Sequence, residues 1–309
     1  MKKLKIMDWL VHGGHQYEFF KTNHNFFCTK MNGIAPLPDE LGRPRNKNVN
    51  YVSGKRAVRE EFDIIIVRLG VSNDTHRKFR YHKSLNIPGI AVIQTHTPFS
   101  VPPWTRCVVW NSKVVMDKFK GKFKRQKHFY IPHGFDHNEF EFLNLKRNNK
   151  MLSAVSVFEK RGKLLGFDNW QWVSDRVKKS DLLGHGNDGL KESIGSFPLE
   201  GLVQKYNEYG VFLNTTTKSA MPRTRAEALM CGTPLVTTSN YGIDRYLVDG
   251  ESCLFANSKE EMLKAVKRIL ASKQLQKDLG SAGREAAIKY FGIKKYIKRW
   301  NEVFAEALR

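Results

Sequence analysis

The residues best placed for chemistry are a carboxylate and the helix end that follows it. Glu227 opens the run Glu-Ala-Leu-Met-Cys-Gly-Thr-Pro, in which Gly232 can adopt the left-handed backbone that ends a helix. Pro234 prevents the helix from continuing, and residues 235–238 are typical of a buried strand. Open α/β sheets bind ligands beside such junctions. The pattern predicts a ligand-binding carboxylate; the alternative is an ordinary helix–strand turn with a solvated Glu.

A second clue is an uneven positive charge. The 309 residues carry a net charge of +22. Residues 1–150 hold 27 Lys and Arg against 12 Asp and Glu, a net +15, whereas residues 151–309 hold 25 against 18, a net +7. A field of this sign attracts nucleic acid, an anionic membrane surface or another acidic polymer. The alternative is a basic surface that only keeps the protein soluble.

Three basic segments of the N-terminal half could contact such a polymer. Residues 43–47 lie in a long loop, residues 75–83 are expected to be helical, and residues 118–127 interleave two Phe with cations. Cations mixed with aromatic rings suit phosphate contact and base stacking, and also suit a membrane surface. The thin apolar face around Lys78 favours a soluble polyanion. The expected acceptor-binding residues are Arg43, Arg45, Lys47, Arg77, Lys78, Arg80, Lys122, Lys124 and Arg125.

Strands that alternate with helices predict two α/β domains with parallel sheets. In the first half, strands are expected at 3–10, 62–67, 90–94, 107–110 and 130–131, a tight turn at 11–15, a helix at 16–22 and a loop at 31–60. In the second half, strands are expected at 152–158, 181–183, 211–213 and 235–238, and helices at 167–177, after the capping box Ser258–Glu261, and at 293–308.

Several motifs resemble the retaining glycosyltransferases of the GT-B fold, family-4 type. Their donor signature is Glu-x7-Glu followed by Ala-x-x-Cys-Gly-Thr-Pro, and its second Glu corresponds to Glu227. Gly13 and Gly14 lie where the family has its first glycine-rich loop, and residues 94–97 resemble the strand end that carries a His facing the donor sugar. Residues 131–136 resemble the family's linker Ile-Pro-Asn-Gly-Val-Asp, and residues 184–186 its Gly-Asp-Gly turn.

The resemblance implies two Rossmann-like domains that face each other across a cleft. The expected boundaries are an acceptor-binding domain at 1–132, a linker at 133–150, a nucleotide-sugar-binding domain at 151–292 and a C-terminal helix at 293–309 that crosses back to the first domain. The donor is expected to be a UDP-sugar, with its ribose hydroxyls bound by Glu227.

The same resemblance assigns roles to individual residues. The diphosphate needs cations, which Arg161 and Lys163 would supply, although Lys160 competes in register. His96 is the candidate for contact with the sugar. The expected catalytic residues are His96, Arg161 and Lys163; the expected donor-binding residues are Gly13, Gly14, Gly184, Ser219, Ala220, Met221, Pro222, Arg223 and Glu227.

One position departs from the family pattern. Ser219 stands eight residues before Glu227, where the family has its first Glu. That Glu contacts the donor sugar, so sugar recognition or mechanism is expected to differ here. Arg223 and Arg225 add charge that the family pattern lacks; they either neutralise the leaving diphosphate or face solvent.

The mechanism commonly proposed for the family needs no protein nucleophile. The leaving diphosphate accepts the acceptor's proton on the same face of the sugar, and the protein contributes positioning and charge stabilisation. The sequence has no Asp-x-Asp motif, so a metal is not implied.

Three hypotheses for the function follow. Phage DNA glucosyltransferases share the GT-B fold, so the first is an enzyme that glycosylates hydroxymethylated pyrimidines in double-stranded DNA, flipping the base into its cleft. The second is an enzyme acting at an anionic membrane surface on a lipid-linked or cell-envelope polymer. The third, prompted by Ser219, is a non-catalytic protein that binds a nucleotide-sugar or DNA.

Composition also indicates the compartment. No apolar run reaches the roughly 18 residues of a membrane span. Asp8 and His12 interrupt any apolar signal-peptide core, and the four cysteines lack metal-type spacing. We therefore expect a cytoplasmic protein, in the host cytoplasm if a phage encodes it.

Overall fold

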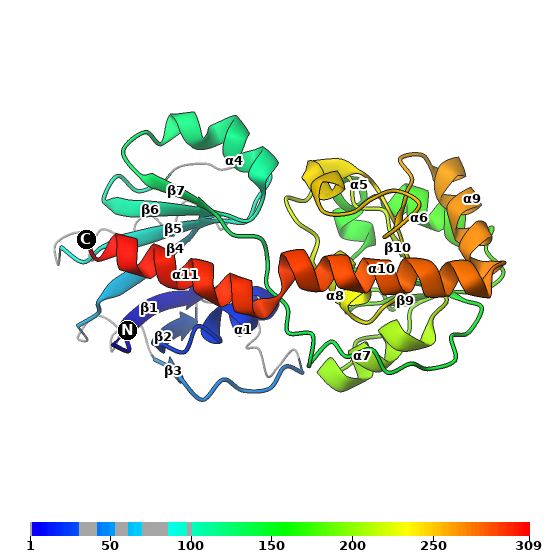
Figure 1. The fold of residues 1–309 in the computed structure, drawn as a ribbon, viewed down its shortest axis with the longest axis horizontal. Helices are drawn as coiled ribbons and strands as arrows, with labels where there is room; N and C mark the ends of the chain where they lie inside the picture. Colours follow the sequence, from blue (N-terminus) through cyan, green and yellow to red (C-terminus); the bar gives the residue numbers. More distant parts are fainter. Residues whose placement is uncertain (1, 31–41, 53–60, 70–85, 98–100) are drawn as a thin grey trace. The chain divides into compact units, whose positions relative to one another are not determined.

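A computed structural model of the chain describes residues 2–30, 42–52, 61–69, 86–97 and 101–309 (Figure 1). The chain divides into two compact units. Unit 1 comprises Met1–Gly134 and Ile293–Arg309, and unit 2 comprises Phe135–Gly292. Each unit is built on its own parallel sheet. The predicted helix that contains residues 75–83 lies outside the described residues.

The described part of unit 1 holds a seven-stranded sheet in the order β3-β2-β1-β4-β5-β6-β7, with every neighbouring pair parallel. Its strands are β1 (Lys5–Leu10), β2 (Asn25–Lys30), β3 (Val49–Tyr51), β4 (Ile64–Leu69), β5 (Gly89–Ile93), β6 (Thr105–Trp110) and β7 (Lys127–Tyr130). Two predictions were wrong here. No strand was predicted at β2, and β3 lies inside the predicted loop 31–60.

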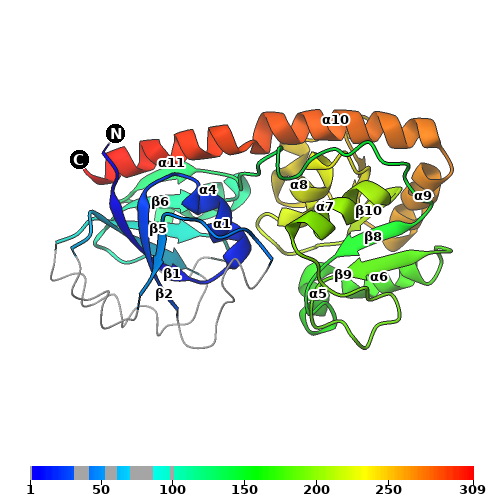
Figure 2. The ribbon, with the colours of Figure 1, turned by 90° about the horizontal axis from the view of Figure 1, so that it is seen from below.

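The core of unit 1 lies between one face of this sheet and two helices, α1 (Gly13–Phe20) and α11 (Ile293–Ala307). In α11 the buried residues are Ile293, Tyr296, Trp300, Val303, Phe304 and Ala307, spaced three or four apart as in an amphipathic helix. The Trp300 ring lies 4.6 Å from that of Phe19 on α1. The C-terminal helix is therefore part of the unit 1 core, as Figures 1 and 2 show. Unit 1 also contains α4 (Lys113–Phe119) and a 3₁₀-helix (Lys120–Lys122).

The sheet of unit 2 has five described strands in the order β12-β11-β10-β8-β9, again all parallel. Its strands are β8 (Met151–Ala154), β9 (Ser180–Leu183), β10 (Val211–Asn214), β11 (Leu235–Thr237) and β12 (Leu254–Phe255). Its helices are α5 (Gly162–Leu165), α6 (Phe167–Ser174), α7 (Leu199–Glu208), α8 (Arg223–Met230), α9 (Lys259–Leu270) and α10 (Lys273–Phe291), with 3₁₀-helices at Glu159–Arg161 and Asn240–Arg245.

Helices cover both faces of this sheet. One core cluster packs α7, α8 and α10 against residues such as Leu152 and Phe212, and the other packs α6 and α9 against Met151 and Leu213. Successive residues of one strand thus enter opposite cores, so both faces of the sheet are apolar, as expected for a parallel sheet.

Two local signals in unit 2 are confirmed. Ser258 and Glu261 form a reciprocal capping box at the start of α9. Gly232 has φ +66° just after the end of α8, where a left-handed residue stops a helix. A Cβ on Gly280 of α10 would lie 2.3 Å from the Gly232 carbonyl oxygen, so α10 can pack closely on the end of α8 (Figure 2).

Candidate functional site

The carboxyl ends of β8 and β10 meet where the strand order of the unit 2 sheet reverses. From β8 the chain passes to β9 on one side, and then to β10 on the other side. Open α/β sheets bind ligands beside the carboxyl ends of the strands at such a switch point. The loops after β8 (155–161) and after β10 (215–222) lie at this edge.

The segment after β8 presents three cations. Lys160, Arg161 and Lys163 are exposed, and their side chains form no hydrogen bond or ion pair with any described residue. They line a hollow of ≈ 540 Å³. Cationic groups without partners beside a hollow can bind an anion such as a phosphate.

Two threonines after β10 fix the position of this cationic segment. Thr217 donates from its hydroxyl to the carbonyl of Lys163 over 2.8 Å, and Thr215 donates to the carbonyl of Leu165 over 2.9 Å. Gly166 follows with φ +74°, and a Cβ there would lie 2.2 Å from the Thr215 carbonyl oxygen. The segments on either side of the switch point are thus held together.

The predicted donor residue Gly184 lies at the turn after β9. Its φ is +128°, and a Cβ would lie 2.3 Å from the carbonyl oxygen of Val155. Asn187 then donates to Val155 O over 2.7 Å and to Gly184 O over 3.1 Å. The glycine allows this turn to approach the loop after β8. Its contact with a donor remains a prediction.

The carboxylate of Glu227 is buried between α7 and α8. The residue is 4% exposed, so the alternative of a solvated Glu is wrong. Its Oε2 accepts a hydrogen bond from the Tyr206 hydroxyl over 3.2 Å, and its Oε1 lies 3.3 Å from Nη2 of Arg223. Both partners offset the cost of burying the charge.

The segment before Glu227 is less polar than the family pattern. Ser219 is half-buried, and its hydroxyl has no hydrogen-bond partner among the described residues. Ala220 is buried, Met221 is half-buried, and Pro222 occupies the N-cap of α8 without a side-chain cap. The guanidinium of Arg223 lies 4.6 Å from the Phe135 ring centre.

In unit 1 the predicted glycine turn is instead the first turn of a helix. Gly13 and Gly14 open α1 and are buried. His12 is the N-cap, because its side chain accepts from the backbone N–H of His15. His96, after β5, is half-buried, and its side chain has no polar partner among the described residues.

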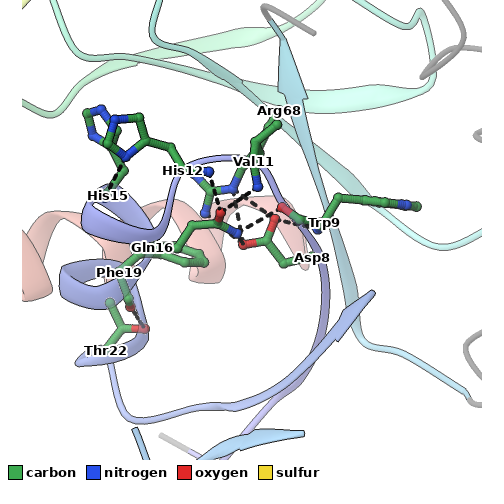
Figure 3. Close-up of polar contacts among 9 residues, drawn as sticks. All are labelled: Asp8, Trp9, Val11, His12, His15, Gln16, Phe19, Thr22 and Arg68. Atoms are coloured by element: carbon green, nitrogen blue, oxygen red, sulfur yellow. Dashed lines mark hydrogen bonds and ion pairs between the residues drawn. The ribbon is translucent and has the colours of Figure 1, made fainter. Parts of the chain in front are cut away.

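A buried network holds the segment between β1 and α1 in place (Figure 3). Arg68 on β4 donates to the Asp8 carboxylate through Nε at 2.8 Å and Nη2 at 2.7 Å. Gln16 donates to Asp8 over 2.9 Å, and its Oε1 accepts from the backbone N–H groups of Val11 and His12. The network therefore fixes the backbone that leads into Gly13.

A histidine cluster at the same edge of unit 1 was not predicted. Nδ1 of His15 lies 3.1 Å from Nδ1 of His133, and the ring of His12 lies 4.1 Å from that of His15. Nε2 of His133 contacts the Asn111 amide over 3.2 Å. Two of these histidines stand in the run His-Gly-Gly-His, but His133 is 118 residues from His15, so spacing alone does not place it there.

Comparison with known proteins decides the family. The family model described as "Glycosyl transferase-like" matches residues 147–302. The chain belongs to this family. The chain is therefore a glycosyltransferase and not a non-catalytic binding protein. No curated protein matches the glycosyltransferase by sequence.

Solved structures share the fold of this glycosyltransferase. A glycosyltransferase from Rickettsia africae is 14% identical with a TM-score of 0.76, covering 100% of both chains. HepE from Anabaena, in complex with UDP and glucose, is 14% identical with a TM-score of 0.73, covering 98% of this chain and 99% of its own. An alpha-glucosyltransferase in complex with UDP is 11% identical with a TM-score of 0.70, covering 98% and 100%. The predicted GT-B fold with two parallel sheets is confirmed.

The expected acceptor residues of the glycosyltransferase differ in accessibility. Lys122, Lys124 and Arg125 are exposed, and so are Arg45 and Lys47. Arg43 is only 8% exposed, and its contact with an acceptor remains a prediction. Arg77, Lys78 and Arg80 lie outside the described residues.

Within the described ranges, no group of three or more His, Cys, Asp or Glu side chains is arranged to hold a metal ion. Among the helices that the structure describes, none is long and apolar enough to cross a membrane.

Proposed function

We propose that this glycosyltransferase is a retaining enzyme that transfers a sugar from a UDP-sugar to a polyanionic acceptor. The best candidate acceptor is a hydroxymethylated pyrimidine base in double-stranded DNA, such as phage DNA. The observation that supports the donor is the set of three cations, Lys160, Arg161 and Lys163, which have no partner among the described residues and line the hollow at the switch point of unit 2.

These cations suit a diphosphate. Its oxygens accept charge-assisted hydrogen bonds from ammonium and guanidinium groups, which are about twice as strong as neutral ones. The structural neighbours that were solved with UDP support uridine as the nucleoside. In the proposed complex the buried carboxylate of Glu227, which Tyr206 and Arg223 orient, accepts hydrogen bonds from the ribose hydroxyls.

The proposed mechanism uses this charge rather than a protein nucleophile. As the bond between sugar and diphosphate breaks, negative charge grows on the leaving phosphate, and Arg161 and Lys163 stabilise it. The same phosphate takes the proton of the acceptor hydroxyl as the new bond forms on the same face. His96 contributes a hydrogen bond to the sugar, since its imidazole has no described partner.

The proposal of a DNA acceptor is supported by the exposed positive charge of unit 1. The exposed cations Lys122, Lys124 and Arg125 follow α4 in unit 1, and Arg45 and Lys47 precede β3. Such residues bind the phosphates of DNA without reading its sequence. A hydroxymethyl group on a stacked base lies in the major groove and cannot enter an enclosed active site, so in the proposed reaction the enzyme flips the nucleotide.

One observation favours the second candidate, an acceptor at a membrane surface. Phe142, Leu143 and Leu145 are 44%, 40% and 41% exposed, and Lys146 follows them in the sequence. Apolar side chains beside a cation can insert at an anionic lipid surface. The segment belongs to unit 2.

A single assay separates the candidates. The enzyme is incubated with a panel of UDP-sugars and, in parallel, with hydroxymethylated DNA, unmodified DNA and vesicles of anionic lipid. Mass spectrometry of nucleosides and lipids then identifies the product, and NMR of the purified product gives its anomeric configuration. The proposal expects a glycosylated hydroxymethyl nucleoside with retained anomeric configuration. Transfer to lipid alone would favour the second candidate, and an inverted linkage would contradict the retaining mechanism.

A further inference from the structure

Unit 2 buries one arginine whose charge no acidic group balances. Arg225 is 2% exposed. Its Nε donates to Asn214 over 3.0 Å, and its Nη2 donates to Thr238 over 2.9 Å and to Asn240 over 2.7 Å. All three acceptors are neutral oxygens, and burial lowers the pKa of the guanidinium to about 9. Nη1 makes no hydrogen bond to any described residue. The expectation that this arginine could simply face solvent was wrong.

The half-buried Arg147 shows how the charge of another arginine in the same unit is balanced. Every terminal nitrogen of Arg147 donates to backbone carbonyls at the carboxyl ends of α7 and α8, where the helix dipoles are negative. The acceptors lie 2.8 to 3.0 Å away and belong to Tyr206, Asn207, Tyr209, Cys231 and Gly232. Arg147 therefore serves as a clamp on two helix ends.

Arg225 stands at the opposite end of α8. It is the third residue of this helix, where the dipole is positive and disfavours a cation. The first turn, which the structure describes in full, contains Arg223 but no acidic residue, and no side chain caps it. A buried, unbalanced charge costs several kcal/mol. An anion bound at this helix end would offset both the charge and the dipole.

The surroundings place this charge at the candidate donor site. Asn214 ends β10 and Thr238 follows β11, so Arg225 lies at the carboxyl edge of the sheet. Asn240, which accepts from Arg225, donates in turn to the carbonyl of Thr217 over 2.9 Å. Thr217 holds the carbonyl of Lys163. The guanidinium is thus linked through two side chains to the cationic segment after β8.

We propose that Arg225, together with the amino end of α8, binds a phosphate of the nucleotide donor through its free Nη1 group. This inference rests on the proposed function and adds to it a residue that the family pattern lacks. It also explains why a buried guanidinium is held by neutral oxygens, since a carboxylate partner would cancel the charge that the phosphate needs.

The test compares ligands that differ only in phosphate content. Calorimetry on the full chain measures the affinity for UDP, inorganic pyrophosphate and uridine in the wild type, Arg225→Gln and Arg225→Lys. We expect Arg225→Gln to lose about tenfold to a hundredfold in affinity for UDP and pyrophosphate, as for one charge-assisted contact, with uridine unchanged. Arg225→Lys should lose less, because it keeps the charge.

Arg147→Lys is the matched control. It weakens the half-buried clamp on α7 and α8, so it should lower the melting temperature and leave the affinity for UDP unchanged. If Arg225→Gln does not fold, Arg225→Lys is the test. Its affinity for pyrophosphate should fall, and its affinity for uridine should not change.

Two results would overturn the inference separately from the proposed function. If the wild type binds UDP and both Arg225 variants bind it equally tightly, Arg225 does not contact phosphate, while the proposed donor stands. The same holds if the variants lose UDP and uridine alike, which indicates a structural role. If the wild type binds neither UDP nor pyrophosphate, both proposals fail.

Discussion

The hydroxyl of Tyr206 on α7 donates a hydrogen bond over 3.2 Å to Oε2 of Glu227 on α8, and both residues are buried. This contact orients the carboxylate from a second helix, while Arg223 pairs with its other oxygen. A carboxylate held from two sides is pre-organised for a ligand and loses little entropy on binding. The arrangement makes Glu227 the side chain whose replacement tests the donor site first.

Replacing Glu227 by Ala should weaken UDP binding. A buried hydrogen bond between a ribose hydroxyl and a carboxylate contributes about 1.5–3 kcal/mol, so the affinity measured by calorimetry should fall about tenfold to a hundredfold. Tyr206→Phe keeps the carboxylate and should lower UDP affinity less. Glu260→Gln, an exposed change on α9, is the control. Unchanged UDP affinity in Glu227→Ala would contradict the placement of the ribose.

The cations after β8 should act on the phosphates alone. Changing Lys160, Arg161 and Lys163 together to Gln should reduce UDP affinity by at least about a hundredfold, since each lost charged contact costs about 1.5–3 kcal/mol. Uridine binding should not change. The measurement is calorimetry at fixed ionic strength, because a protein of net charge +22 binds anions non-specifically.

The matched control removes three exposed cations from another part of unit 2, the helix α9. In the α9 control triple, Lys264, Lys267 and Arg268 are replaced by Gln. Equal losses of UDP affinity in this triple and in the triple after β8 would show that net charge, rather than a site, binds the nucleotide.

The buried pair of Asp8 and Arg68 should matter for stability in unit 1. Asp8→Asn leaves the Arg68 guanidinium buried without its counter-charge, which costs about 3–5 kcal/mol in such pairs. The exposed pair of Lys113 and Asp117 is the control, and Asp117→Asn should cost less than about 1 kcal/mol. Urea unfolding measures both. A cost below about 1 kcal/mol for Asp8→Asn would show that the network does not hold the segment before α1.

The exposed cations of unit 1 should set the salt dependence of DNA binding. Each phosphate contact contributes about 0.9 to the slope of log affinity against log salt. Changing Lys122, Lys124 and Arg125 to Gln should therefore reduce the slope by up to about 2.7, as measured by fluorescence anisotropy over a salt series. The α9 control triple should leave it unchanged. An unaltered slope in the unit 1 triple would exclude these residues from the DNA interface.

The capping box of α9 predicts a pH effect with a definite sign. Backbone N–H groups of Asn257 and Ser258 donate to Glu261 and lower its pKa below the ordinary 4.5. Because the folded pKa is the lower one, this contribution is present above pH 4.5 and is lost as the pH falls through the folded value. Glu261→Gln should lower the melting temperature at pH 7, and the difference should shrink in acid. Glu260→Gln should show no such trend.

The sequence predicted well those features that depend on local chemistry. Gly232 and Pro234 stop α8, Ser258 and Glu261 cap α9, and the spacing of apolar residues in α11 matches its buried face. These signals lie within a few residues of their effect. The parallel sheets followed from apolar runs that alternate with helices.

What the sequence missed depends on tertiary contacts. The short edge strand β3 lies in a segment of turn-forming residues, and only pairing with β2 makes it a strand. Gly13 and Gly14 have low helix propensity, yet the cap at His12 starts α1 before them. Arg225 is buried and is held by neutral partners. Its place in the sequence does not predict this environment, because the partners come from other elements of unit 2.

The most direct measurement is a crystal structure of the glycosyltransferase with UDP bound. We expect the diphosphate within hydrogen-bonding distance of the cations after β8, and the ribose hydroxyls on the Glu227 carboxylate. Electron density for UDP anywhere else, or a Glu227 carboxylate that makes no contact with the ribose in the complex, would overturn the proposed donor site.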